Sequence, residues 1–125
     1  VFSQPPASLP SNIALGPALA HPEALARMRT FAAGLIPFLQ TPLTDAVDPV
    51  KFYEYRGLGL PVISTPFGEM RARSRTDGVL LTEKPSAARS EIEALLAHRD
   101  TAESVAAFRS AHDWSACFEP LAALI

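Results

Sequence analysis

The sequence predicts an α/β fold, a Rossmann-like parallel sheet flanked by helices, within a single domain. The main observation is the order of segments in residues 34–70: strand, long loop, helix, glycine turn and second strand. The apolar runs GLIPFL and LPVIS are typical of strands in a parallel sheet that is buried on both faces. The length of 125 residues suits one domain with its own hydrophobic core.

Apolar runs between turn-forming residues indicate the strands. We expect strands at residues 12–15, 35–39, 60–64 and 78–82, and a short strand end at residues 1–4. Pro61 is compatible with the third of these because it lies at the start of the run. Strands that alternate with helices predict βαβ units with right-handed crossovers.

Helical spacing of apolar residues predicts a first helix over residues 22–31, with Pro22 near its start and Gly34 just beyond its end. The second helix is expected to begin with Pro49 at its first position, capped by Asp48, and to end near Gly57. Pro49 suits that position because the first amide of a helix has no partner within the helix.

Three more helices are expected in the C-terminal part, over residues 86–98, residues 101–111 and the segment after Asp113. Pro120 should kink or restart the last one, because proline lacks the N–H that would bond to Ala116.

Composition excludes several classes of protein. With 48% hydrophobic and 19% charged residues, the chain should be a globular domain, and no apolar run approaches the length of a membrane span, about 18 residues. A net charge of −2 gives no general attraction to nucleic acid. The single cysteine, Cys117, fits a reducing cytoplasm, and no signal peptide is visible at the start of the sequence.

The loop at residues 40–48 is longer than the roughly 2–6 residues typical of βα connections, and such loops are often functional. In parallel sheets ligands bind beyond the carboxyl ends of the strands, so the loops after Leu39 and Ser64 should border any site. Lys51 and Glu54 share one face of the intervening helix, near its electropositive N-terminus. A cation, a carboxylate and free amides suit a phosphorylated sugar or a nucleotide.

The same region carries a family resemblance. The segment KFYEYRGLGLPVISTPFGE resembles K-x-x-E-Y-x-x-x-G-x-P-V-[VI]-[SA]-[ST], a pattern of the C-terminal, donor-binding domain of GT-B-fold glycosyltransferases, group 1 or family 4-like. Three shorter segments also resemble that domain: NIALG at residues 12–16, GLIPF at 34–38, and DWS at 113–115. The likeness covers nearly the whole chain, although only residues 51–65 are specific.

The resemblance implies a nucleotide-diphosphate sugar as ligand, and Glu54 as the residue that accepts hydrogen bonds from the ribose hydroxyls. Lys51, with the amides of Val50 and of Lys51 itself, would meet the diphosphate, and Thr65 would pass close to the donor. Simpler interpretations stay open: Glu54 as an exposed residue paired with Lys51, Lys51 as a solvated lysine, and Thr65 as part of a turn.

One departure from the family concerns the loop before the helix. Many retaining members carry a second glutamate at the position that Ala46 occupies here. Asp45 is the nearest acid and would serve after a shift of one residue, although Asp45 and Asp48 are more often plain loop and cap residues. Retention or inversion at the anomeric centre is therefore open, and no residue of this chain is assigned as catalytic.

The resemblance further implies transfer of a sugar to an acceptor such as a surface glycan, with no metal cofactor. The acceptor-binding N-terminal domain would lie outside this chain, as would the first strand and helix of the donor domain. The chain alone would then bind the donor weakly and catalyse no transfer. The alternatives are a non-catalytic α/β interaction domain and part of a nucleotide-sugar epimerase.

The remaining polar and aromatic residues receive simpler interpretations. The three histidines show no metal-ligand spacing. Arg71, Arg73 and Arg75 are expected to form a solvated loop face rather than to bring positive charge to an anionic ligand. The aromatic side chains in and near the second helix, and the tryptophan, are expected to be packing residues: Phe52, Tyr53, Tyr55 and Trp114.

Overall fold

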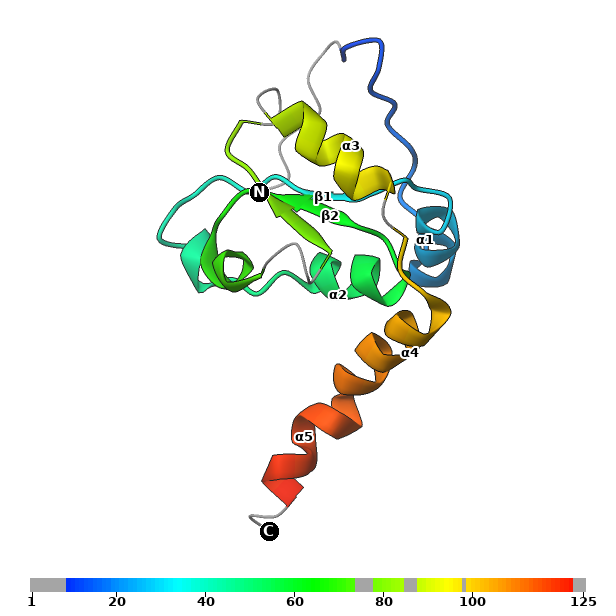
Figure 1. The fold of residues 1–125 in the computed structure, drawn as a ribbon, viewed down its shortest axis with the longest axis vertical. Coiled ribbons are helices and arrows are strands. Elements are labelled where there is room, and N and C mark those ends of the chain that lie inside the picture. Colours follow the sequence, from blue (N-terminus) through cyan, green and yellow to red (C-terminus); the bar gives the residue numbers. More distant parts are fainter. Residues whose placement is uncertain (1–8, 74–77, 85–87, 98, 123–125) are drawn as a thin grey trace.

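The computed structural model describes residues 9–73, 78–84, 88–97 and 99–122. The chain contains helices and strands in the order α1, β1, α2, β2, β3, α3, α4, α5, with two short 3-10 helices, η1 and η2 (Figure 1). Their bounds are α1 His21–Met28, β1 Gly34–Ile36, η1 Thr44–Ala46, α2 Val50–Gly57, β2 Val62–Ser64, η2 Gly68–Ala72, β3 Val79–Leu81, α3 Arg89–Ala97, α4 Ala102–Ala111 and α5 Trp114–Ala122.

In the described part of the chain, three parallel strands form one small sheet in the order β1-β2-β3. Gly34 pairs with Val62 in the first ladder, and Val62 pairs with Val79 in the second. The predicted α/β class with a parallel sheet is therefore confirmed. The strands are shorter than the apolar runs that predicted them, and β1 ends just before Pro37.

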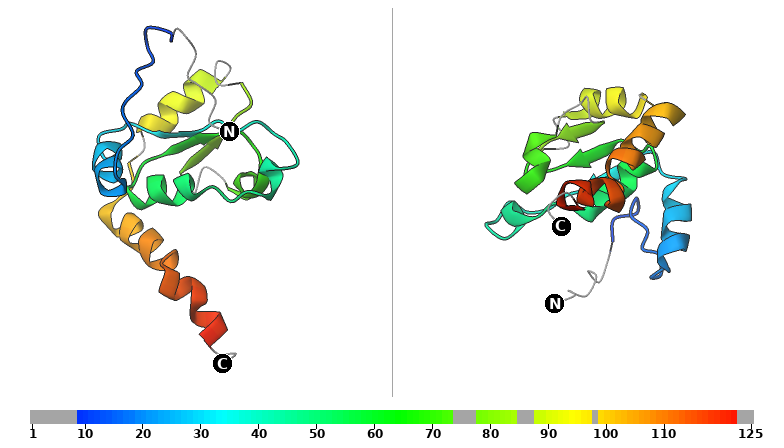
Figure 2. Two further views of the ribbon diagram at one scale, coloured as in Figure 1. Left: turned by 180° about the vertical axis from the view of Figure 1, so that it is seen from behind. Right: turned by 90° about the horizontal axis from the view of Figure 1, so that it is seen from below.

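Helices lie on both faces of the sheet, with α2 on one side and α3 on the other (Figures 1 and 2). The core on the α2 side consists of six buried residues from the strands, α2 and the segment around η2: Ile36, Phe52, Val62, Phe67, Met70 and Val79. The α3 side has a smaller core of Leu80, Ala88 and Leu95. Leu35 lies between the two buried residues of β1 and is 61% exposed. The expectation that both faces would be buried is wrong for β1, because the α3 core lies over β3.

Close contact with the sheet fixes the position of α2. A Cβ atom at Gly34 would lie 2.1 Å from the Tyr55 ring, so only glycine permits this approach of β1 to the helix. Phe52 and Arg56, one turn apart on α2, are both buried.

Arg56 forms the main buried polar contact. Its guanidinium lies 2.7 Å from Asp100 and donates to the Leu60 carbonyl at 3.0 Å, and both side chains of the ion pair are about one-tenth exposed. Gly78 (φ +71°) lies against the guanidinium, where a Cβ atom would approach it to 2.5 Å. The pair therefore ties the end of α2 to the segment before α4 and to the start of β3.

The strand expected at residues 12–15 is not found among the described residues, whereas the first expected helix is present as α1. Residues 12–15 form no strand in the described part of the chain, and Ile13 and Leu15 are exposed. The Ile13 amide instead donates to the Pro10 carbonyl in a turn. An apolar run alone therefore misled the prediction, because a strand also needs a neighbour to pair with. The strand end expected at residues 1–4 lies outside the described residues.

The start of α2 also differs from the prediction. Pro49 is the residue before the helix, with extended backbone (φ −78°, ψ 117°), and no side chain among the described residues caps α2. Asp48 instead accepts from the Tyr53 hydroxyl and from Arg73. The predicted Asp48 cap is wrong because these two donors occupy its carboxylate.

The C-terminal helices α4 and α5 run away from the sheet (Figures 1 and 2). Helix α5 is continuous through position 120, so of the kink or restart expected at Pro120 the restart is wrong; a proline removes only one bond from the ladder. The kink stays a prediction. Trp114 is 76% exposed and stacks on Phe118 with ring centroids 5.4 Å apart. The expectation that Trp114 is a packing residue is also wrong, because α5 begins beyond the core.

Breaking the buried ion pair should destabilise the protein strongly. We expect Arg56→Leu to lower the free energy of unfolding by about 3–5 kcal/mol, because Asp100 loses a charged partner in a buried site. Arg89→Ala is the matched control, since its ion pair with Glu93 is largely exposed, and we expect a change within about 0.5 kcal/mol. Urea unfolding followed by circular dichroism measures both, and equal stability of Arg56→Leu and the wild type would contradict the prediction.

Candidate functional site

The candidate site is built around α2, which starts at the edge of the sheet where the parallel strands end. At that edge the Thr65 hydroxyl donates to the Phe38 carbonyl at 2.6 Å and so ties the segments after β2 and β1 together. Thr65 is therefore a brace between the two loops that the sequence placed at the site. Its hydroxyl hydrogen already has an acceptor within the protein.

Glu54 lies at the centre of a small charged cluster. Its side chain is only 14% exposed, and its two carboxylate oxygens have different partners. Oε2 accepts from the Lys51 ammonium at 2.5 Å, and Oε1 lies 3.0 Å from Nε2 of His21, the first residue of α1. The structure therefore brings Lys51 and Glu54 together as their spacing predicts, and it adds His21.

This environment keeps Glu54 ionised. Burial raises the pKa of the carboxyl group, but hydrogen bonds from Lys51 and His21 and their positive charge outweigh burial, so the pKa lies below its usual value of 4.5. A carboxylate with this pKa is fully charged at neutral pH. It is then a hydrogen-bond acceptor only, and it can accept from hydroxyl groups of a ligand.

The start of α2 offers donors beside this acceptor. Val50, the first residue of the helix, is exposed, and among the described residues no side chain caps its amides. Amides of a first helical turn carry partial positive charge and bind anions. Lys51 adds a full charge on a half-exposed side chain.

Asp45 lies apart from this cluster. It belongs to η1, where its Oδ1 accepts from Arg71 at 2.8 Å and from the Gly68 amide at 3.4 Å. These bonds join η1 to η2, the two 3-10 helices that follow β1 and β2. In this structure Asp45 braces the two loops, while Val50, Lys51 and Glu54 lie together in α2.

Sequence reasoning missed two contributors to this region. His21 lies 33 residues before Glu54, and no local pattern connects them. Arg73, expected on a solvated face, instead bonds to Asp48 and lies over the Phe52 ring at 3.7 Å. Its neighbour Arg71 pairs with Asp45, whereas Arg75 lies outside the described residues.

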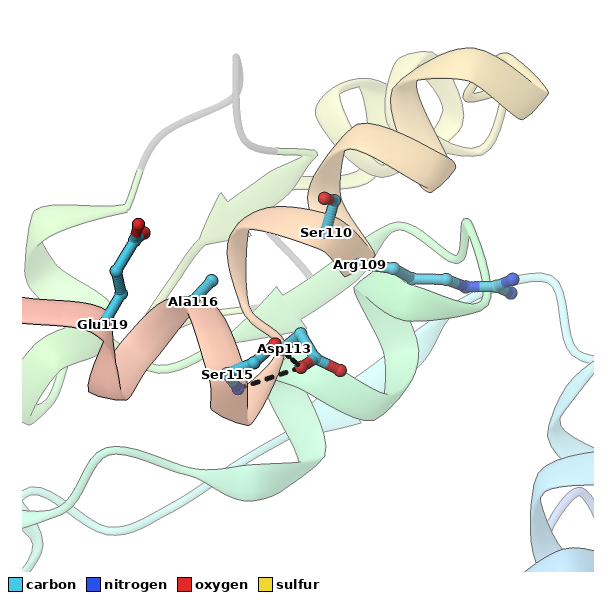
Figure 3. A pocket seen from close by; sticks show the side chains of 6 residues that line it. All are labelled: Arg109, Ser110, Asp113, Ser115, Ala116 and Glu119. Carbon is cyan, nitrogen blue, oxygen red and sulfur yellow. Dashed lines mark hydrogen bonds between the residues drawn. The ribbon is translucent and has the colours of Figure 1, made fainter. Parts of the chain in front are cut away.

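Surface grooves lie near the helices. One of about 700 Å³ lies at the junction of α4 and α5, away from the predicted residues, and Figure 3 shows its lining side chains. There Asp113 accepts from the Ser115 amide and hydroxyl, which lower the pKa of Asp113 and cap α5. The second groove, of about 620 Å³, includes Glu54 and His21 and so belongs to the candidate site.

Two further properties concern only the residues that the structure describes. They contain no group of three His, Cys, Asp or Glu side chains placed to hold a metal ion. None of their helices combines the length and the apolar character needed to cross a membrane.

Comparison with known proteins identifies no family for this chain. No family model, curated protein or solved structure matches this chain.

The lowered pKa of Glu54 predicts a pH dependence of stability. A group with a depressed pKa in the folded state stabilises the protein above its unfolded pKa, near 4.5, and this contribution disappears as the pH falls through the folded pKa. We therefore expect the stability advantage of the wild type over Glu54→Gln to be full at pH 7 and to shrink below about pH 4.5. Urea unfolding of both proteins between pH 7 and pH 3 measures this difference.

The comparison with Glu54→Gln removes the contribution of Asp113, whose pKa is also lowered and which titrates in both proteins. If the stability advantage of the wild type over Glu54→Gln stayed constant down to pH 3, the lowered pKa of Glu54 would be contradicted.

Proposed function

We propose that this chain is the donor-binding domain of a GT-B-like glycosyltransferase, group 1 or family 4-like, with a nucleotide-diphosphate sugar as its ligand. The observation that carries the proposal is the state of Glu54: a largely buried, ionised carboxylate one turn into a helix with an uncapped N-terminus. The motif that resembles the family contains the same residue. A small parallel α/β sheet is compatible with the C-terminal half of the GT-B fold.

In this proposal each group has one role. The carboxylate of Glu54 accepts hydrogen bonds from the ribose hydroxyls. The amides of Val50 and Lys51 and the Lys51 ammonium hold the diphosphate, whose negative charge grows as it leaves. The two backbone amides are fixed donors and stabilise the departing diphosphate without motion of the protein, whereas Lys51 must first leave Glu54.

The transfer itself needs groups outside this chain. The bond between the sugar C1 and the diphosphate oxygen breaks, the acceptor hydroxyl oxygen forms the new bond to C1, and its proton passes to a base. We assign the base and the acceptor surface to the N-terminal domain of the two-domain enzyme. By itself this chain then binds the donor and transfers no sugar.

One observation favours the rival, a non-catalytic α/β domain. Asp45, the nearest substitute for the acid that Ala46 replaces, is engaged by Arg71 and the Gly68 amide. A chain that keeps the fold but lacks this acid would use its loops for protein contact. Nucleotide binding decides between the two proposals, because a non-catalytic domain should bind no nucleotide. An epimerase domain would also bind the nucleotide, but it would catalyse a different reaction.

Titration calorimetry with UDP, GDP and their sugars tests the proposal. We expect saturable binding of one nucleotide, and Glu54→Gln should weaken it by about 10- to 100-fold, because a hydrogen bond to a charged acceptor contributes about 1.5–3 kcal/mol. Lys51→Met should weaken binding of the diphosphate but not that of the nucleoside, because Lys51 competes with the ribose hydroxyls for Glu54.

Glu93→Gln is the matched control for this experiment, since Glu93 is also a helical glutamate paired with a basic neighbour, Arg89. Its affinity should equal that of the wild type. Absence of binding by a folded wild-type chain, or equal losses in Glu54→Gln and Glu93→Gln, would argue for the rival.

A further inference from the structure

The groove that contains Glu54 extends along α2, between α1 and the end of α4. Its volume of about 620 Å³ lies within the range of small-molecule sites, roughly 300–1,000 Å³. Helix α2 lines it with Tyr53, Glu54 and Gly57, followed by Leu58. These positions form one stripe along the helix, so the groove continues from Glu54 toward the C-terminal end of α2.

The order of groups along α2 matches the order of groups in a nucleotide. Glu54 lies four residues after Val50 and four before Leu58, and each step is about 6 Å at 1.5 Å per residue. In a nucleoside diphosphate the ribose lies between the phosphates and the base. With the diphosphate at Val50 and the ribose at Glu54, the base therefore falls in the groove beside Leu58.

The wall of the groove formed by α2, α4 and α5 is aromatic. The rings of Phe108 and His112 stack with centroids 4.2 Å apart, and Tyr53 lies 5.3 Å from His112. Trp114 also lines the groove and leaves three-quarters of its surface exposed. Tyr53 and Phe108 are partly buried against the core, whereas His112 and Trp114 are exposed. Exposed flat rings are the usual platform on which nucleobases stack.

The polar groups of the groove also suit a base. Nδ1 of His112 lies 2.8 Å from the Phe108 carbonyl oxygen, and since that oxygen only accepts, Nδ1 carries the proton. In the neutral ring Nε2 is then an acceptor. Arg29 and Arg109 supply donors, of which Arg109 Nε already donates to the Gly57 carbonyl.

We propose that this groove binds the nucleobase of the donor, and that its polar groups select a base with a carbonyl oxygen and a ring N–H, a class that contains uracil, thymine and guanine. The inference rests on the proposed function and adds the base to it. The guanidinium groups donate to a carbonyl oxygen of the base, and His112 Nε2 accepts from its ring N–H. Adenine has no carbonyl oxygen and should bind more weakly.

Fluorescence titration tests the inference directly, because Trp114 is the single tryptophan of the sequence. We expect UDP or GDP to quench its emission with the same Kd that calorimetry gives, and ADP to bind more weakly. By calorimetry with the preferred nucleotide, Trp114→Ala should raise Kd roughly tenfold through loss of stacking. His112→Phe keeps the ring stack, removes the acceptor, and should raise Kd roughly fivefold.

Phe31→Ala is the control, because Phe31 is an exposed aromatic residue outside the groove lining, and its Kd should not change. Nucleotide binding that depends on Glu54 but is unchanged in Trp114→Ala and His112→Phe would overturn the base site and leave the proposed function standing. No nucleotide binding by the folded wild type would overturn both.

Discussion

The buried contact between Arg56 and Asp100 fixes the rotation of α2, and the candidate site depends on that rotation. Residues two apart on a helix point about 200° apart, since each residue turns the helix by about 100°. With Phe52 and Arg56 held inward, Glu54 must therefore project from the opposite side, toward α1. The glycine at position 34 adds a second constraint, because it lets Tyr55 approach β1 closely. The direction of Glu54 thus follows from contacts made by its neighbours.

Local patterns predicted the parts of this fold that local physics determines. Apolar runs located β1, β2 and β3, and helical spacing located α1 and α2 to within a few residues. The burial of Arg56 was beyond such reasoning, because an arginine is expected at the surface unless a partner is known, and its partner Asp100 lies far along the chain. The false strand at residues 12–15 has the same origin: its apolar residues were visible, but the pairing that a strand requires was not.

In the candidate site, too, local sequence predicts some contacts and tertiary structure determines the others. The Lys51–Glu54 contact follows from spacing within one helix, and the structure contains it. Asp48 was expected at the helix start on the general preference for acidic caps, yet Tyr53 and Arg73 compete for its carboxylate. Trp114 was assigned to the core because large aromatic residues are usually packed, whereas the position of α5 beyond the sheet leaves it exposed. Each of these errors reflects a tertiary contact, or its absence, that no window of sequence contains.

The state of Glu54 in the free protein also bears on how a ligand would enter. Both of its oxygens already have protein partners, so ribose hydroxyls must replace them or share them. Lys51 and His21 are both more than half exposed, whereas Glu54 is largely buried, so the ribose hydroxyls must replace the hydrogen bonds that Glu54 gives up. Lys51 belongs to the first turn of α2, so once released from Glu54 it lies on the turn whose amides would hold the diphosphate. Under the proposed function, binding of the ribose and binding of the diphosphate would thus support each other, since the first frees the cation that the second requires.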